Sequence, residues 1–173
     1  MRIRLTVLLV LIAGGCGQPF WRPRPPRSEP FPEPASATAI QALSIERSPC
    51  MDTSCASYRY TFRSNGRATY DSLSPVNAGL VQRATAAVDS ATFAALAGAV
   101  LERGFFHLQE RYSTGTTDVR EVTVRAVLSD TVKTVVEEEA TGPTALHIVQ
   151  LLLDSVATRL PWQLSRGLTS ACS

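Results

Sequence analysis

Residues 58-YRYTFRSNGRATY-70 contain the clearest strand–turn–strand pattern in the chain. The aromatic and polar residues of this stretch alternate, with Tyr58, Tyr60 and Phe62 on one side and Arg59, Thr61 and Arg63 on the other. Successive side chains of a strand point to opposite faces, so the three aromatic residues share one face. Asn65-Gly66 is a preferred pair for a type I′ turn, in which both central residues have a positive φ. The stretch therefore predicts a β-hairpin with an aromatic face.

Similar alternation on both sides of this hairpin predicts further strands. These patterns lie at residues 43–46, 80–88, 119–128 and 132–137. Ser129 and Asp130 favour a turn between the last two strands, which predicts a second hairpin. Strands joined by such short turns must pair antiparallel.

A first helix is predicted after the fourth strand. Asp89 and Ser90 are good N-caps, and Gly104 is placed to end the helix. The apolar stripe at helical spacing comprises Phe93, Leu96, Ala97, Val100 and Leu101. The residues expected to continue the core beyond the helix, in a short extended piece, are Phe105, Phe106 and Leu108.

A second helix is predicted to begin at Gly142-Pro143, with proline at the tolerated first position, and to end before Pro161. Its apolar residues are Leu146, Val149, Leu152, Leu153, Val156 and Leu160. Each helix has one apolar side, which must be buried against the sheet. The order of the elements therefore predicts a two-layer α+β fold, in which two helices pack on one face of a mostly antiparallel sheet.

The N-terminus has the pattern of an export signal. Arg2 and Arg4 precede an apolar run from Leu5 to Ala13, which is too short to span a membrane. The run ends in Ala13-Gly14-Gly15-Cys16, which is typical of a lipobox. We therefore expect cleavage before Cys16 and lipid attachment to its thiol and amino group; the alternative is an ordinary secretory signal with a chance cysteine.

A proline-rich segment separates this cysteine from the folded domain. It contains seven prolines between Pro19 and Pro34, which excludes regular helix or sheet and favours a semi-rigid spacer over a docking motif. The predicted organisation is a signal peptide at 1–15, a lipidated linker at 16–39, one globular domain at 40–163 and a tail at 164–173. Gly17 is not the aspartate typical of inner-membrane retention, so the outer membrane is favoured in a host that has one.

The charge of the mature chain argues against nucleic-acid binding. Of its 17 basic residues, Arg2 and Arg4 leave with the signal, so the mature chain carries 15 basic and 15 acidic residues. A nucleic-acid binder needs a basic surface for the phosphates.

Cys50 and Cys55 are predicted to form a disulfide, because they are close in sequence in an exported chain. A redox-active pair is the weaker alternative, since the spacing is not Cys-x-x-Cys. A zinc site would need a second ligand pair, which the sequence does not supply. Cys172 is left without an assigned role.

The histidines and the acidic run give no convincing catalytic or metal site. His107 and His147 are interpreted as structural, because no serine lies in a nucleophile elbow. The run Glu137–Glu139 is interpreted as a solvated cap at a strand end, and calcium binding with Asp118 is the alternative. We predict no cofactor and no bound metal.

The polar side of the hairpin provides a possible binding surface. Its members are Arg59, Arg63 and Arg67, with Arg125 expected on the same face. An arginine-rich open sheet is suited to docking a partner, but an ordinary solvated face has the same composition.

Together these segments resemble an uncharacterised family of small bacterial exported domains. The motifs that carry the resemblance are the turn from Cys50 to Cys55, the tyrosine-rich hairpin, the helix ending in Gly104-Phe105 and the closing helix begun by Gly142-Pro143. The resemblance covers roughly residues 40–162. It implies the architecture and the exported location, and no activity.

The function predicted from all of this is a membrane-anchored envelope lipoprotein whose domain binds a partner protein without catalysis. One alternative is an envelope hydrolase that uses His107 or His147 with a carboxylate. The other is a structural lipoprotein that acts as a spacer at the cell wall.

Overall fold

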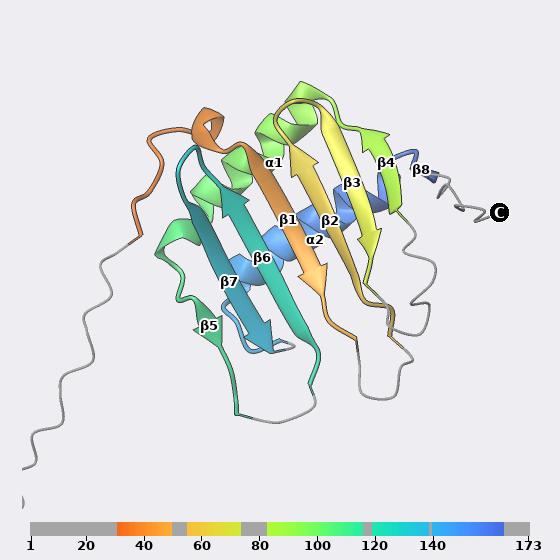
Figure 1. The fold of residues 1–173 in the computed structure, drawn as a ribbon. Coiled ribbons are helices and arrows are strands. Elements are labelled where there is room, and N and C mark those ends of the chain that lie inside the picture. The colour runs from red at the N-terminus through yellow and green to blue at the C-terminus, as the bar shows by residue number, and fades with distance from the viewer. Residues whose placement is uncertain (1–30, 50–54, 74–82, 116–118, 139, 165–173) are drawn as a thin grey trace, which may run out of the picture.

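In the computed structural model, the described residues are 31–49, 55–73, 83–115, 119–138 and 140–164. They form a sheet with two α-helices on one of its faces (Figure 1). The strands are β1 (Ala42–Arg47), β2 (Tyr58–Arg63), β3 (Arg67–Ser72), β4 (Arg83–Ala87), β5 (Arg111–Tyr112), β6 (Glu121–Val127), β7 (Val132–Glu138) and β8 (Gln163–Leu164). The helices are α1 (Ser90–Glu102) and α2 (Thr144–Arg159), with short 3-10 turns η1 (Ala37–Ala39) and η3 (Phe105–His107). The predicted α+β class is confirmed.

The strand order is β5-β7-β6-β1-β2-β3-β4-β8. Strand β1 joins the two predicted hairpins, because it pairs antiparallel with β2 on one edge and with β6 on the other. The sheet is antiparallel throughout the described residues except where the short β5 pairs parallel with β7. The sequence patterning gives no sign of β5 or β8, because two residues are too few to show alternation.

The central hairpin is confirmed, but its predicted turn type is wrong. Gly66 has a φ of 84°, whereas Asn65 is not among the described residues with a positive φ. The Gly66 N–H donates to the Arg63 carbonyl at 3.1 Å, so the loop has three residues and ends in a left-handed glycine. This is the common alternative to the two-residue turn. In this register Tyr60 lies opposite Tyr70, so the aromatic residues of both strands share one face.

Helix α1 begins and ends where its sequence signals predict. The Asp89 carboxylate accepts from the Thr92 N–H at 2.8 Å, and Gly104 has a φ of 64° just after the helix. The expected extended piece is instead the 3-10 turn η3, so that prediction is wrong. The left-handed glycine turns the chain back onto the core, and this places Phe105 and Phe106 in the interior.

Helix α2 starts one residue later than expected, with Pro143 as its N-cap. The side that it buries comprises Leu146, Val149, Gln150, Leu153 and Ala157. Leu152, predicted to be part of this side, is exposed at the surface. No helix in the described part of the chain is long and apolar enough to cross a membrane.

The core lies between the sheet and the two helices. Its largest fully buried side chains include Phe62 from the central hairpin, Phe105 and Phe106 after α1, and Leu146 and Leu153 of α2. Trp162, just after α2, packs against the aromatic face of the hairpin, with its ring centroid 5.5 Å from that of Tyr60. The helices therefore cover the aromatic face of the hairpin and leave its arginine face open (Figure 1).

Candidate functional site

The open face of the sheet carries the three arginines of the predicted binding surface, but they differ in their environment. Arg59 is half-buried, and its Nη2 lies 2.6 Å from Glu46 Oε2 on the neighbouring strand β1. Arg125 of β6 donates to the same oxygen at 3.0 Å. Arg59 and Arg125 thus form an internal ion-pair cluster with Glu46.

The charges in this cluster stabilise one another. Burial raises the pKa of Glu46, but hydrogen bonds from Arg125 and Arg59 and their positive charges outweigh burial and hold this pKa below its ordinary value of 4.5. Glu46 therefore stays ionised at neutral pH. Its charge offsets part of both guanidinium charges, so Arg59 is the least available of the three predicted binding residues.

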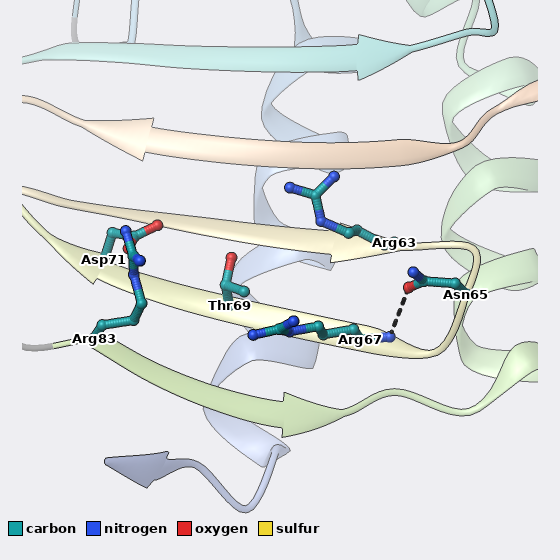
Figure 2. A pocket seen from close by; sticks show the side chains of 6 residues that line it. All are labelled: Arg63, Asn65, Arg67, Thr69, Asp71 and Arg83. Carbon is teal, nitrogen blue, oxygen red and sulfur yellow. Dashed lines mark hydrogen bonds and ion pairs between the residues drawn. The ribbon is translucent and has the colours of Figure 1, made fainter. Parts of the chain in front are cut away.

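Arg63 and Arg67 are exposed on either side of the hairpin loop. Neither has an ion-pair partner among the described residues. Both line a groove of about 520 Å³ (Figure 2), whose other lining residues are Asn65, Thr69, Asp71 and Arg83. Arg83 Nε donates to Asp71 Oδ1 at 2.6 Å, so these two partly neutralise each other. The two hairpin arginines are the groove's uncompensated charges.

A second cluster lies on the helix side of the sheet, around Glu137 at the end of β7. This side chain is only 1% exposed. It accepts hydrogen bonds from the Gly142 N–H at 2.7 Å and from Gln150 Nε2 at 2.6 Å, and its Oε2 lies 3.0 Å from His147 Nε2. The loop before α2 and the first two turns of the helix thus surround one buried carboxylate.

His147 stands between this carboxylate and solvent. It lines a shallow pocket of about 250 Å³ together with Arg47, Ala140 and Leu151. Ala140 has a φ of 61°, a left-handed conformation that is strained for a residue with a Cβ. A histidine oriented by a buried carboxylate also occurs in catalytic triads, where the imidazole acts as the general base. In the described part of the chain no serine, threonine or cysteine lines this pocket as a nucleophile.

The interpretation of the acidic run as a solvated cap is wrong for two of its members. Glu138 points to the opposite face from Glu137, as strand alternation requires, and it is also buried. It accepts from the Ser113 hydroxyl and from the Thr114 N–H at 2.8 Å. The hydroxyl and the backbone N–H, with the charge of Arg111, hold the pKa of Glu138 below its ordinary value.

A metal site is not supported by the described residues, where no three histidine, cysteine, aspartate or glutamate side chains are grouped to hold an ion. Asp118 and Glu139, which the calcium alternative would use, lie outside the described residues. The lipidation residue Cys16, one partner of the predicted disulfide (Cys50) and Cys172 also lie outside them. Lipidation of Cys16 and pairing of Cys50 with Cys55 stay predictions.

His107 contacts the end of the proline-rich segment. Its Nε2 lies 2.8 Å from Glu33 Oε2, and the Phe31 ring stacks on Phe106 with the centroids 5.7 Å apart. Lys133 Nζ lies 5.4 Å from the centroid of the Phe31 ring. The packed structure therefore extends N-terminally of residue 40, at least to Phe31.

Sequence reasoning missed the Glu137 cluster, although one signal for it was present. Lys133, Val135 and Glu137 occupy alternate positions of β7, so they share a face. Val135 is fully buried in the core, and Glu137 must therefore point inward as well. The sequence predicts Gly142 only as the start of a helix, whereas in the structure its backbone N–H also donates to Glu137.

Comparison with known proteins bears on the fold and not on these sites. No curated protein matches the chain. The profile of the family described as "Domain of unknown function (DUF6438)" matches residues 41–157. This match runs from β1 into the last turn of α2. It includes the central hairpin, the helix ending in Gly104 and most of the closing helix that carried the resemblance noted from the sequence. The chain therefore belongs to the DUF6438 family, whose function is unknown.

Proposed function

We propose that this protein is a lipid-anchored envelope lipoprotein whose domain binds a partner protein through the open face of its sheet. One observation carries the binding role. Arg63 and Arg67 project from a sheet face that no described helix covers, and neither has an acidic partner among the described residues. Exposed arginines on a rigid strand scaffold are suited to charge-complementary docking.

The anchor is supported by the sequence around Cys16. The basic start, the short apolar run and the small residues before Cys16 favour lipid attachment, and several acyl chains on one cysteine anchor stably. Because Phe31 packs on the domain, about fourteen residues lie between the anchor and the packed structure. A proline-rich sequence favours an extended chain of about 3.1 Å per residue, at which these residues would span roughly 45 Å.

Crosslinking in living host cells tests this function. The tagged protein is crosslinked and purified, and its captured proteins are identified by mass spectrometry. We expect one envelope protein to be enriched repeatedly, and to be lost when Arg63→Gln and Arg67→Gln are combined. Arg103→Gln, which removes an exposed arginine at the end of α1, is the matched control. Cys16→Ser should release the protein from the membrane fraction.

Two results would contradict the proposal. The first is an intact, lipidated protein that captures no partner. The second is a partner captured equally well by the double arginine variant, which would place the contact elsewhere on the molecule.

A hydrolase is the second candidate, and the Glu137–His147 pair is the observation that favours it. The carboxylate is buried and held by hydrogen bonds from Gly142 and Gln150, so its position is fixed and it can orient the imidazole. His147 borders a pocket in which a water or substrate could approach its ring. A cellular phenotype lost in His147→Gln but retained in Arg63→Gln/Arg67→Gln would favour this candidate over the binding role.

A further inference from the structure

The groove on the open face follows from the register of three neighbouring strands. Arg59 of β2 lies opposite Asp71 of β3, which in turn lies opposite Arg83 of β4. With Glu46 of β1 opposite Arg59, this row alternates in charge across four strands. The row is paired internally, because Arg59 binds Glu46 and Arg83 binds Asp71.

The next row toward the hairpin loop consists of hydroxyl side chains. Thr61, Thr69 and Thr85 lie directly opposite one another on β2, β3 and β4. At a strand spacing of about 4.8 Å, the three threonines form a line of roughly 10 Å that can both donate and accept hydrogen bonds. This line borders the paired charges on one side.

On the other side of this line stand Arg63 and Arg67, at the ends of the strands that the loop connects. The same alternation that puts Thr61 and Thr69 on the open face puts both arginines there. The loop is held by a hydrogen bond from the Arg67 N–H to Asn65 Oδ1 at 3.2 Å. Figure 2 shows the Arg67 side chain lying along β3 toward Thr69.

These charges make the groove selective for anions. Its lining contains three arginines and one aspartate, so its net charge is +2. Arg63 and Arg67 have no acidic counter-charge among the described residues, and an anion that reaches both guanidinium groups would accept charge-assisted hydrogen bonds from each. The planar donors of arginine match the two oxygens of a carboxylate.

The residues around the groove indicate which kind of anion it can bind. A membrane-binding surface carries four to eight basic residues, and a nucleic-acid surface carries a basic stripe. The groove has only two uncompensated arginines, and its far end bears Asp71. A single phosphate group would leave the row of threonines without a partner, whereas the amide groups of a peptide can bond to that row along its length.

We propose that this groove binds an acidic segment of a partner protein, in which a side-chain carboxylate bridges Arg63 and Arg67 and the segment's amides contact Thr69 and its neighbouring threonines. This inference rests on the proposed binding function and names the chemistry of the partner. It predicts charge-assisted, salt-sensitive binding, because both arginines are exposed to solvent.

Fluorescence anisotropy with the full mature chain in detergent tests the inference. The probe is a short labelled peptide of alternating glutamate and serine, and its control replaces each glutamate with glutamine. We expect the glutamate peptide to bind and the glutamine peptide not to bind. Combined Arg63→Gln and Arg67→Gln should weaken binding about tenfold or more, which corresponds to about 1.4 kcal/mol, while Arg103→Gln should leave it unchanged. Circular dichroism checks that the variants fold.

Three results would overturn the inference. The glutamate peptide fails to bind, or binds no better than the glutamine peptide, or binds equally to the double variant. Inorganic phosphate and phosphatidylglycerol vesicles are tested in parallel, and retention of the protein by either through Arg63 and Arg67, without peptide binding, would assign the groove to phosphate or lipid. A cellular partner that is lost with the two arginines but has no acidic segment would overturn this inference and leave the proposed function standing.

Discussion

Glu137 Oε2 lies 3.0 Å from His147 Nε2, and this contact ties the end of β7 to the first turns of α2. The carboxylate is almost fully buried, whereas the imidazole is about one-third exposed. Glu137 has no arginine or lysine partner among the described residues. Its stabilisation depends on hydrogen-bond donors that the loop and helix provide.

Removal of this carboxylate is expected to destabilise the fold strongly. Glu137→Ala leaves the Gly142 N–H, the Gln150 amide and the imidazole without their acceptor, at a cost of about 2–4 kcal/mol in the free energy of unfolding. Chemical denaturation measures this loss. Glu102→Ala, at the exposed end of α1, is the control and should change stability by less than about 0.5 kcal/mol. A cost for Glu137→Ala as small as that of the control would contradict this account.

Gly142 should not tolerate even a methyl group. A Cβ there would overlap Glu137 Oε2 and approach Leu146 Cδ2 to 2.8 Å, so Gly142→Ala is expected to cost about 1–3 kcal/mol. Gly98 offers a matched control, because it lies within α1 and a Cβ there meets nothing within 4 Å. Gly98→Ala should stabilise the protein by about 0.5–1 kcal/mol, since alanine favours a helix over glycine. Thermal or chemical unfolding of both variants shows whether each substitution raises or lowers the stability. Equal effects of the two substitutions would refute the prediction.

The low pKa of Glu138 predicts an acid-sensitive contribution to stability. This pKa is depressed in the folded state by the Ser113 hydroxyl, the Thr114 N–H and Arg111. A carboxyl group whose pKa is lower in the folded state than in the unfolded state stabilises the fold at pH values above the unfolded-state pKa. This contribution is lost as the pH falls through the folded-state pKa. Stability measured by denaturation between neutral pH and pH 3 should therefore fall less steeply for Glu138→Gln than for the wild type. Glu102→Gln should retain the wild-type slope, and an unchanged slope in Glu138→Gln would contradict the assignment.

Phe31 is expected to hold the end of the linker on the domain. Its ring stacks on Phe106 and faces Lys133, so Phe31→Ala should lower the free energy of unfolding by about 1 kcal/mol. The control is Leu164→Ala, because Leu164 is 69% exposed. If the two substitutions cost the same in a denaturation experiment, the Phe31 contact does not contribute to stability.

Residue patterns were sufficient where a single element carries its own signal. The alternation in residues 58–70 fixes which side of the hairpin is buried, and Asp89 and Gly104 mark the ends of α1 through local backbone requirements. The same local logic placed Arg63 and Arg67 on one face. These predictions depend on periodicity and capping, which act over a few residues.

The errors occurred where distant contacts decide the conformation. Asn65-Gly66 is compatible with more than one hairpin loop, and the three-residue loop lets the Gly66 carbonyl accept from the Val88 N–H at 3.0 Å, far along the chain. Glu138 is buried because residues 113–114 lie over it, which a run of glutamates does not reveal. The binding surface was also overestimated, since Arg59 is paired with a glutamate on a strand that is remote in the sequence.

Alternation and helix caps are local properties of the chain, so they were enough to predict the α+β class, the two helices, the central hairpin and the arginines on its polar side. Which charges remain uncompensated depends instead on contacts between strands that are distant in the sequence. Ion pairs form between strands that the sheet brings together. Arg59 therefore pairs with Glu46, whereas Arg63 and Arg67 have no ion-pair partner among the described residues. The same is true of Glu137, whose donors converge only when α2 packs on the sheet.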